Sequence, residues 1–208
     1  MKWCLLLVLA VGPLLAGEGP RLFYSKSFPG SMPAYVQITL ESGGEVEYRE
    51  APDDESPLSY KLTSAETAEV FGLADKMDHF KTPVESGLKV AFMGKKTFRW
   101  ENGPEKHELD FNYSEDPNAR AMWEWFERMT ESAQQRINLD RAAKYDKLGV
   151  FEAVTMLGAA LDRKRLVGLE QYLPTLDRII KNESYMHTAR VRASEIAETI
   201  RAGAGSTQ

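Results

Sequence analysis

The sequence predicts an α+β fold, in which helices pack on one face of an antiparallel sheet and a small C-terminal helical bundle follows. Residues 21–113 alternate apolar and polar side chains over short stretches that are separated by turn-forming residues. From residue 117 onward, apolar side chains recur every three or four positions, which is the spacing of one helix face. The predicted units are an α+β domain at 21–138, a helical subdomain at 139–202 and a flexible tail at 203–208.

The first 16 residues have the three parts of a secretory signal peptide. Lys2 gives a positive start, an apolar run follows at residues 3–11, and Gly12-Pro13 breaks that run before the small residue Ala16. The alternative is a buried N-terminal strand or helix, but no polar periodicity interrupts the run. We therefore expect cleavage after Ala16 and a periplasmic or extracellular product.

The mature chain is expected to be free of the membrane and free of thiols. The apolar run is too short to span a bilayer, which needs about 20 residues. Glu18 stands where a lipid-anchored export signal would need a cysteine. The only cysteine, Cys4, lies in the segment to be removed, which excludes disulfides and thiolate metal sites. We therefore expect no membrane insertion after cleavage and a fold held by burial of its core.

The first predicted strands form a hairpin with a third strand after it. Residues 42–44, Ser-Gly-Gly, permit a tight turn, and a polar loop with proline at each end occupies residues 51–57. A third strand is predicted at residues 58–62. The apolar residues that alternate along the two hairpin strands are Val36, Ile38, Leu40, Val46 and Tyr48.

One helix and three more strands complete the predicted α+β unit. Thr63 followed three residues later by Glu66 predicts a capping box at the start of the helix. We expect this helix to end near Phe80, before Pro83. A three-stranded antiparallel meander is then predicted at residues 88–92, 97–100 and 106–113.

The rest of the chain is predicted to be helical. Asp116-Pro117 has the residue types of an N-cap and a first helical position. The apolar stripe of that helix includes Met122, Trp123, Phe126, Met129 and Ala133. Three shorter amphipathic helices follow and are expected to form an antiparallel bundle. Pro174 lies inside the middle one and should either kink it or mark a late start.

The composition and charge are those of a globular, mildly acidic protein. With 43% hydrophobic and 27% charged residues, the chain is not of the disordered class. Residues 17–138 hold 14 basic and 22 acidic side chains, a net charge of −8, and residues 139–208 hold 11 basic and 9 acidic ones, a net charge of +2. The acidic first unit argues against nucleic acid as a partner.

Packing residues and a glycine turn also carry a resemblance. They are Tyr35-Val36-Gln37-Ile38-Thr39-Leu40, Gly44-Glu45-Val46-Glu47-Tyr48, a helix opened by Leu62-Thr63 and ending in Asp78-His79-Phe80, residues 98–111 and a tryptophan-rich helix. In these features residues 32–131 resemble a family of bacterial secreted domains of unknown function, which implies a fold and no site. The helices from Val150 on, particularly Ala189 to Ile200 with the run Ala-Arg-Val-Arg-Ala-Ser-Glu-Ile-Ala, resemble one and a half helical-hairpin repeats of the HEAT kind, which implies a docking appendage.

The three histidines do not form a metal-binding motif. His107-Glu108 lacks the second histidine, one helical turn later, that a zinc site needs. Alternation with Leu109 and Phe111 instead predicts a half-buried strand position for His107. His79 is expected in the last turn of its helix, where a partly positive ring suits the helix dipole.

Neither serine nor carboxylate chemistry has a complete motif. Ser31 lacks the second glycine and the following helix of a nucleophile elbow. Glu108 and Asp110 share one face of a predicted strand, where they could act as acid and base or simply contact water. The acidic cluster at residues 53–55 lacks the ligand spacing and central glycine of a calcium loop. We therefore predict no catalytic residue, no metal site and no cofactor.

The tryptophans supply more aromatic surface than one helix stripe requires. Trp125 falls off the face that Met122 and Phe126 share; Trp123 lies in the same predicted helix, and Trp100 ends a predicted strand. An exposed tryptophan beside a sheet could bind a partner chain or a sugar ring. The alternative is that Trp125 packs against the C-terminal helices.

These observations favour a non-enzymatic module of the cell envelope that binds another envelope or extracellular protein. The expected contact is the sheet or the region of Trp100, Trp123 and Trp125. The first alternative is a carboxylate-dependent hydrolase acting on glycans, which requires two facing carboxyls with divergent pKa values. A purely structural envelope protein is the second alternative.

Overall fold

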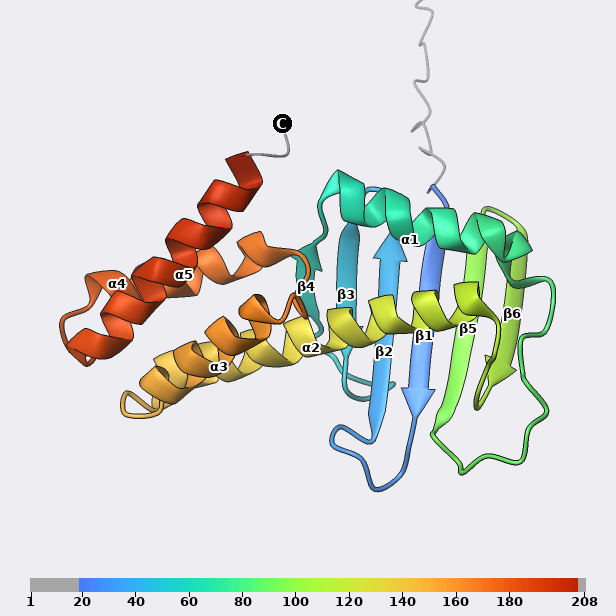
Figure 1. Cartoon of the computed structure of the whole chain (residues 1–208), viewed down its shortest axis with the longest axis horizontal. Helices are drawn as coiled ribbons and strands as arrows, with labels where there is room; N and C mark the ends of the chain where they lie inside the picture. The colour runs from blue at the N-terminus through green and yellow to red at the C-terminus, as the bar shows by residue number, and fades with distance from the viewer. Residues whose placement is uncertain (1–18, 206–208) are drawn as a thin grey trace, which may run out of the picture.

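The structure, a computed structural model, describes residues 19–205, so the predicted signal peptide and the cleavage position at Ala16 lie outside the described residues. One antiparallel sheet is covered on one face by two helices, and a helical unit lies beyond its edge (Figure 1). This architecture confirms the predicted α+β fold with a helical C-terminal region. The strand order is β4-β3-β2-β1-β5-β6.

The strands alternate buried and solvent-facing side chains, as the sequence pattern predicts. Their bounds are β1 Arg21–Ser27, β2 Tyr35–Glu41, β3 Glu45–Arg49, β4 Leu58–Lys61, β5 Lys95–Asn102 and β6 Glu105–Phe111. The predicted hairpin is β2–β3, and the predicted third strand is β4. His107 is half-buried on β6, opposite Trp100 of β5, as expected from its alternation.

The centre of the sheet differs from the predicted meander. β1, which the sequence pattern did not single out, pairs with both β2 and β5, so that Tyr24 lies between Ile38 and Phe98. The predicted strand at residues 88–92 is an exposed loop instead. The place beside β5 that this segment would have needed is occupied by β1, and β6 takes the other side.

Helix α1 (Ser64–Lys76) begins at the predicted capping box. The Thr63 side chain accepts a hydrogen bond from the Glu66 backbone N–H, and the Glu66 carboxylate accepts one from the Thr63 backbone N–H. The helix ends before His79, which lies in a 3₁₀ turn (Asp78–Phe80) with a left-handed φ of 52°. His79 is therefore outside the last helical turn in which it was expected; its ring stacks on Trp100 at a centroid distance of 4.0 Å.

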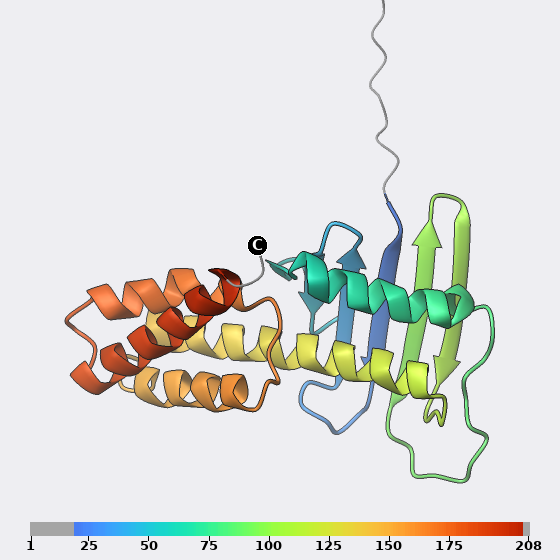
Figure 2. The ribbon, with the colours of Figure 1, turned by 45° about the horizontal axis from the view of Figure 1, so that its top comes forward.

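Helix α2 (Pro117–Tyr145) joins the two units of the molecule without a break. Asp116 caps it as predicted, because its carboxylate accepts a hydrogen bond from the Ala119 backbone N–H at 2.8 Å. Its 29 residues cover about 43 Å at 1.5 Å per residue, so α2 reaches beyond the sheet (Figure 2). Ile137 packs against the sheet core, whereas Leu139 belongs to the core of the helical unit.

The helical unit packs the end of α2 with three further helices. They are α3 (Val150–Asp162), α4 (Leu173–Lys181) and α5 (His187–Gly205), and a short 3₁₀ turn at Leu169–Tyr172 precedes α4. Pro174 lies in the first turn of α4 and marks the late start that was one of its two predicted roles. The buried Ser132 hydroxyl of α2 accepts a hydrogen bond from the Val167 backbone N–H, which fixes the connection between the units.

Candidate binding surface

Two of the three tryptophans expected at a contact surface are buried. Trp100 is 4% exposed and Trp125 is 6% exposed, while Trp123 is half-buried. Trp125 packs in the sheet core, donates a hydrogen bond from Nε1 to the Glu69 carboxylate of α1 at 3.2 Å, and carries the Arg128 guanidinium over its ring. Trp125 therefore packs against α1, because α2 buries a wider arc than one stripe where α1 lies alongside it.

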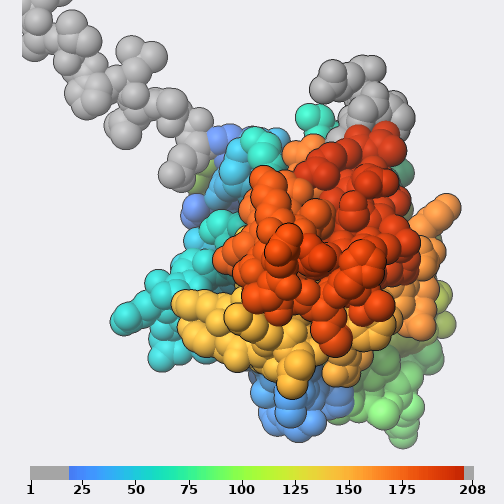
Figure 3. All heavy atoms as spheres, turned by 90° about the vertical axis from the view of Figure 1, so that its left-hand side faces the viewer, coloured from blue at the N-terminus to red at the C-terminus, as the bar shows by residue number. Residues whose placement is uncertain are grey.

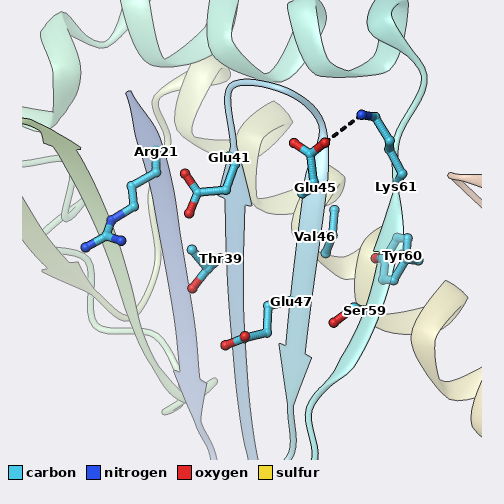
Figure 4. A pocket seen from close by; sticks show the side chains of 9 residues that line it. All are labelled: Arg21, Thr39, Glu41, Glu45, Val46, Glu47, Ser59, Tyr60 and Lys61. Atoms are coloured by element: carbon cyan, nitrogen blue, oxygen red, sulfur yellow. Dashed lines mark hydrogen bonds and ion pairs between the residues drawn. The ribbon is translucent and has the colours of Figure 1, made fainter. Parts of the chain in front are cut away.

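On the face of the sheet away from the helices, charged side chains of neighbouring strands form ion pairs. Arg21 and Glu101 pair across β1 and β5 at 2.5 Å, and Lys61 pairs with Glu45 across β4 and β3 at the same distance. A shallow depression of about 590 Å³ lies over β2, β3 and β4 on this face (Figure 4). The hydrogen bond from Lys61 lowers the pKa of the Glu45 carboxyl. These pairs are typical of a solvated face.

The two carboxylates that were candidates for an acid–base pair form ion pairs with basic side chains. Glu108 pairs with Arg99 at 3.3 Å, and Asp110 pairs with Lys95 at 2.7 Å. Partial burial would raise the pKa of Asp110, but the hydrogen bonds from Lys95 and Thr97 outweigh it, and the net shift is downward. A glycosidase acid needs the opposite shift. This arrangement gives no support to the hydrolase alternative.

The remaining candidates of the sequence are structural in the described part of the chain. The Ser31 hydroxyl bonds to the carbonyls of Phe28 and Pro33 and closes the β1–β2 loop on itself. Residues 53–55 lie in the β3–β4 loop. Within residues 19–205 no group of three histidine, cysteine, aspartate or glutamate side chains is placed to hold a metal ion.

A cluster of exposed apolar side chains lies where two loops project from the same end of the sheet. One loop joins β1 to β2, and the other precedes β5 (Figure 1; Figure 3, bottom, blue and green). We call this cluster the apolar tip, and it consists of Met32, Leu88, Val90, Phe92 and Met93. Their exposed fractions are 98%, 51%, 39%, 58% and 38%, respectively. A cluster of exposed apolar residues is the usual mark of a contact surface.

The two loops of the tip are joined to each other and to the sheet. The Phe28 and Phe92 rings meet edge to face at 5.9 Å. The Asn112 side chain accepts a hydrogen bond from the Met93 backbone N–H at 2.7 Å and donates one to the Ala91 carbonyl at 3.2 Å. The backbone of the second loop is therefore tied to the residue that follows β6, and its apolar side chains are left facing outward.

The buried side chain of Lys96 supports the base of the tip. Its ammonium donates hydrogen bonds to the carbonyls of Asn112 at 2.7 Å, Gly94 at 3.3 Å and Met93 at 3.4 Å. It also lies 4.4 Å from the centre of the Trp123 ring. Burial, followed by the charge of Lys26, lowers the pKa of Lys96 to about 8. A lysine in a core position is costly unless its donors are satisfied, and here all three donors reach carbonyl groups.

Glu127 of α2 connects the same region to the helix layer. Its carboxylate accepts hydrogen bonds from Trp123 Nε1 at 2.8 Å, Lys26 Nζ at 3.0 Å and the Tyr24 hydroxyl at 3.3 Å. Burial and the negative charge of Glu127 raise the pKa of the Tyr24 hydroxyl. Trp123 thus acts as a packing residue over Lys96, and Glu127 fixes the end of β1, from which the first tip loop departs, to α2.

Sequence reasoning missed the tip because its pattern is that of a strand. Leu88, Val90 and Phe92 alternate with smaller or charged residues, and this alternation predicted a buried face. Gly87 and Gly94 bracket the segment with φ values of +70° and +94°, which turn the chain away from the sheet. The signal that could have identified this exposed loop is an alternating apolar segment with a glycine at each end.

No protein-family model matches the chain, and no curated protein is detectably similar to it. Among the described residues, none of the helices combines the length and the apolar composition that a membrane crossing requires.

Proposed function

We propose that this protein is a non-enzymatic binding module of the cell envelope and that the apolar tip is its contact surface. The observation that carries the proposal is the gathering of five exposed apolar side chains from two separate loops at one end of the sheet. This surface replaces the tryptophan region as the expected contact. Its support by Lys96 and Asn112 gives it the fixed backbone that a preformed binding surface requires.

The energy available from the tip is adequate for a specific contact. Complete burial of a phenylalanine, leucine or methionine side chain contributes about 1.5–3 kcal/mol, and the five tip residues are now between one-third and fully exposed. Their burial would contribute on the order of 5 kcal/mol before the cost of association.

The envelope location rests on the predicted signal peptide. Purified native protein is expected to begin at residue 17, after cleavage behind Ala16, and to fractionate with the envelope. N-terminal sequencing checks the cleavage. A chain that begins at residue 1 and fractionates with ribosomes would contradict the proposed envelope location.

The contact surface is tested by site-specific photo-crosslinking in intact cells. A benzophenone side chain at position 92 is expected to form adducts with an envelope component, because Phe92 lies in the tip. The matched control places the same group at position 148, where Leu148 is 80% exposed at the α2–α3 turn. Adducts at 148 alone, or at neither position, would show that the tip is not the contact.

A further inference from the structure

We infer that the apolar tip docks on the surface of a bilayer rich in anionic lipids. This inference rests on the proposed function and names the partner of the same surface. It departs from the expectation that the mature chain stays away from the membrane, although the attachment is peripheral and uses loops. Three features of the described residues carry it: the shape of the tip, its local charge, and the distribution of charge around it.

The tip residues are exposed on two separate loops, and the depression over β2, β3 and β4 is lined by other residues. Met32 is 98% exposed at the end of the β1–β2 loop, and Leu88 and Phe92 are more than half exposed on the second loop. A rigid protein partner would have to present a pocket for each such side chain. The boundary between lipid headgroups and acyl chains accepts projecting apolar side chains to a depth of about 5–10 Å without a matching shape.

The charged side chains that lie within the two tip loops are lysines, although the α+β unit as a whole is acidic. Residues 28–34 carry no charge, and residues 87–96 carry three lysines and no acidic residue, of which Lys96 is buried and Lys89 and Lys95 are exposed. Lys89 stands between Leu88 and Val90 and is exposed. Lys95 is also exposed, and it pairs with Asp110. Lysines that flank apolar side chains are the residues that anionic lipid headgroups attract.

The position of the acidic side chains gives the docked module an orientation. The acidic β3–β4 loop, with Asp53 and Glu55 exposed, lies at the same end of the sheet as the tip. The strand order places it over β3 and β4, whereas the tip loops depart from β1, β2 and β5. An anionic surface would repel this loop, so the β5 side of the sheet lies closer to the membrane.

A second copy of the chain fits the tip less well than a lipid surface does. A two-fold contact through this tip would bring the Lys89 side chains of both copies into one apolar interface. Like charges in a contact of this kind oppose association. The lipid surface supplies the opposite charge instead.

The test is co-sedimentation of the mature full chain with vesicles of phosphatidylcholine alone or of phosphatidylcholine with an equal amount of phosphatidylglycerol. We expect binding to the anionic vesicles that is at least about tenfold tighter than to the neutral ones and that weakens as salt is added. The double variant Leu88→Ser/Phe92→Ser should lose about tenfold or more, and Lys89→Glu should also weaken binding. The double variant Asp53→Asn/Glu55→Gln should strengthen it.

The control is Leu148→Ser, which removes a more exposed apolar side chain at the α2–α3 turn, far from the tip, and should leave vesicle binding unchanged. Circular dichroism and thermal unfolding verify that every variant is folded. Equal binding to both vesicles, no binding, or equal losses in the control and the tip variant would overturn the lipid inference. If vesicles fail while position 92 crosslinks to a protein, the proposed function stands and its partner is that protein; if both fail, both proposals fall.

Discussion

The buried ammonium of Lys96 should give the folding of this protein a distinct dependence on pH. Its side chain is fully buried on β5, and its folded-state pKa is lowered to about 8 from the ordinary value of 10.5. Between these two values the unfolded chain binds a proton that the folded chain has released. The free energy of unfolding therefore rises with pH in this window, and the contribution is lost again as the pH falls through 8.

The expected magnitude follows from the separation of the two pKa values. A shift of one pKa unit corresponds to about 1.4 kcal/mol. Because the titration is only partly complete at each end, the gain between about pH 7 and about pH 9.5 is roughly 2 kcal/mol. The buried tyrosines Tyr24, Tyr48 and Tyr60 have raised pKa values in the folded protein, so they lower the free energy of unfolding as the pH rises. This effect begins only near pH 10, where the tyrosines of the unfolded chain ionise.

The assay is urea unfolding of the native chain and of Lys96→Met at several pH values across this window. The variant has no group to titrate at this position, so its stability should lack the rise of roughly 2 kcal/mol. Lys95→Met is the matched control, because Lys95 is exposed and the hydrogen bond that it donates to Asp110 raises its pKa out of the window. A Lys96→Met protein that keeps the full rise, or a control that loses it, would refute the assignment of this pH dependence to Lys96.

Two further substitutions test the base of the tip and the joint between the units. Gly94→Ala should destabilise the protein by at least about 1 kcal/mol, because φ is +94° and the new Cβ would lie 2.9 Å from that of Phe28. The control is Gly72→Ala in helix α1, where open space surrounds the new Cβ, and it should stabilise the protein by up to about 1 kcal/mol. Ser132→Ala should cost about 1–3 kcal/mol, since the buried Val167 N–H loses its acceptor. Thermal unfolding of the three variants measures these changes, and equal effects of the two glycine substitutions would contradict the first expectation.

The local parts of the fold were predictable from the sequence because their signals act over three or four residues. The capping box at Thr63 and the cap at Asp116 lie where the residue types place them. The β2–β3 hairpin and the late start of α4 at Pro174 follow from turn and proline geometry. Each of these features is decided by hydrogen bonds and steric limits within one turn of the chain.

The burial of the tryptophans and the exposure of the apolar tip were not predictable in this way, because burial depends on which elements meet. Trp125 is buried only because α1 lies beside α2, and Lys96 only because Trp123 and the residues after β6 enclose it. The alternation at residues 88–92 suggested a strand, and the pairing of β1 with β5 excluded it from the sheet.

The sequence by itself thus determined the class of fold, the capped starts of α1 and α2 and the alternation of the strands, all of which follow from local geometry. The tertiary structure alone decided the strand order, the burial of the tryptophans and the exposure of the apolar tip. These are contacts between residues up to about a hundred positions apart, such as the hydrogen bond from Tyr24 to Glu127, and no local pattern specifies which distant partner fills a given place.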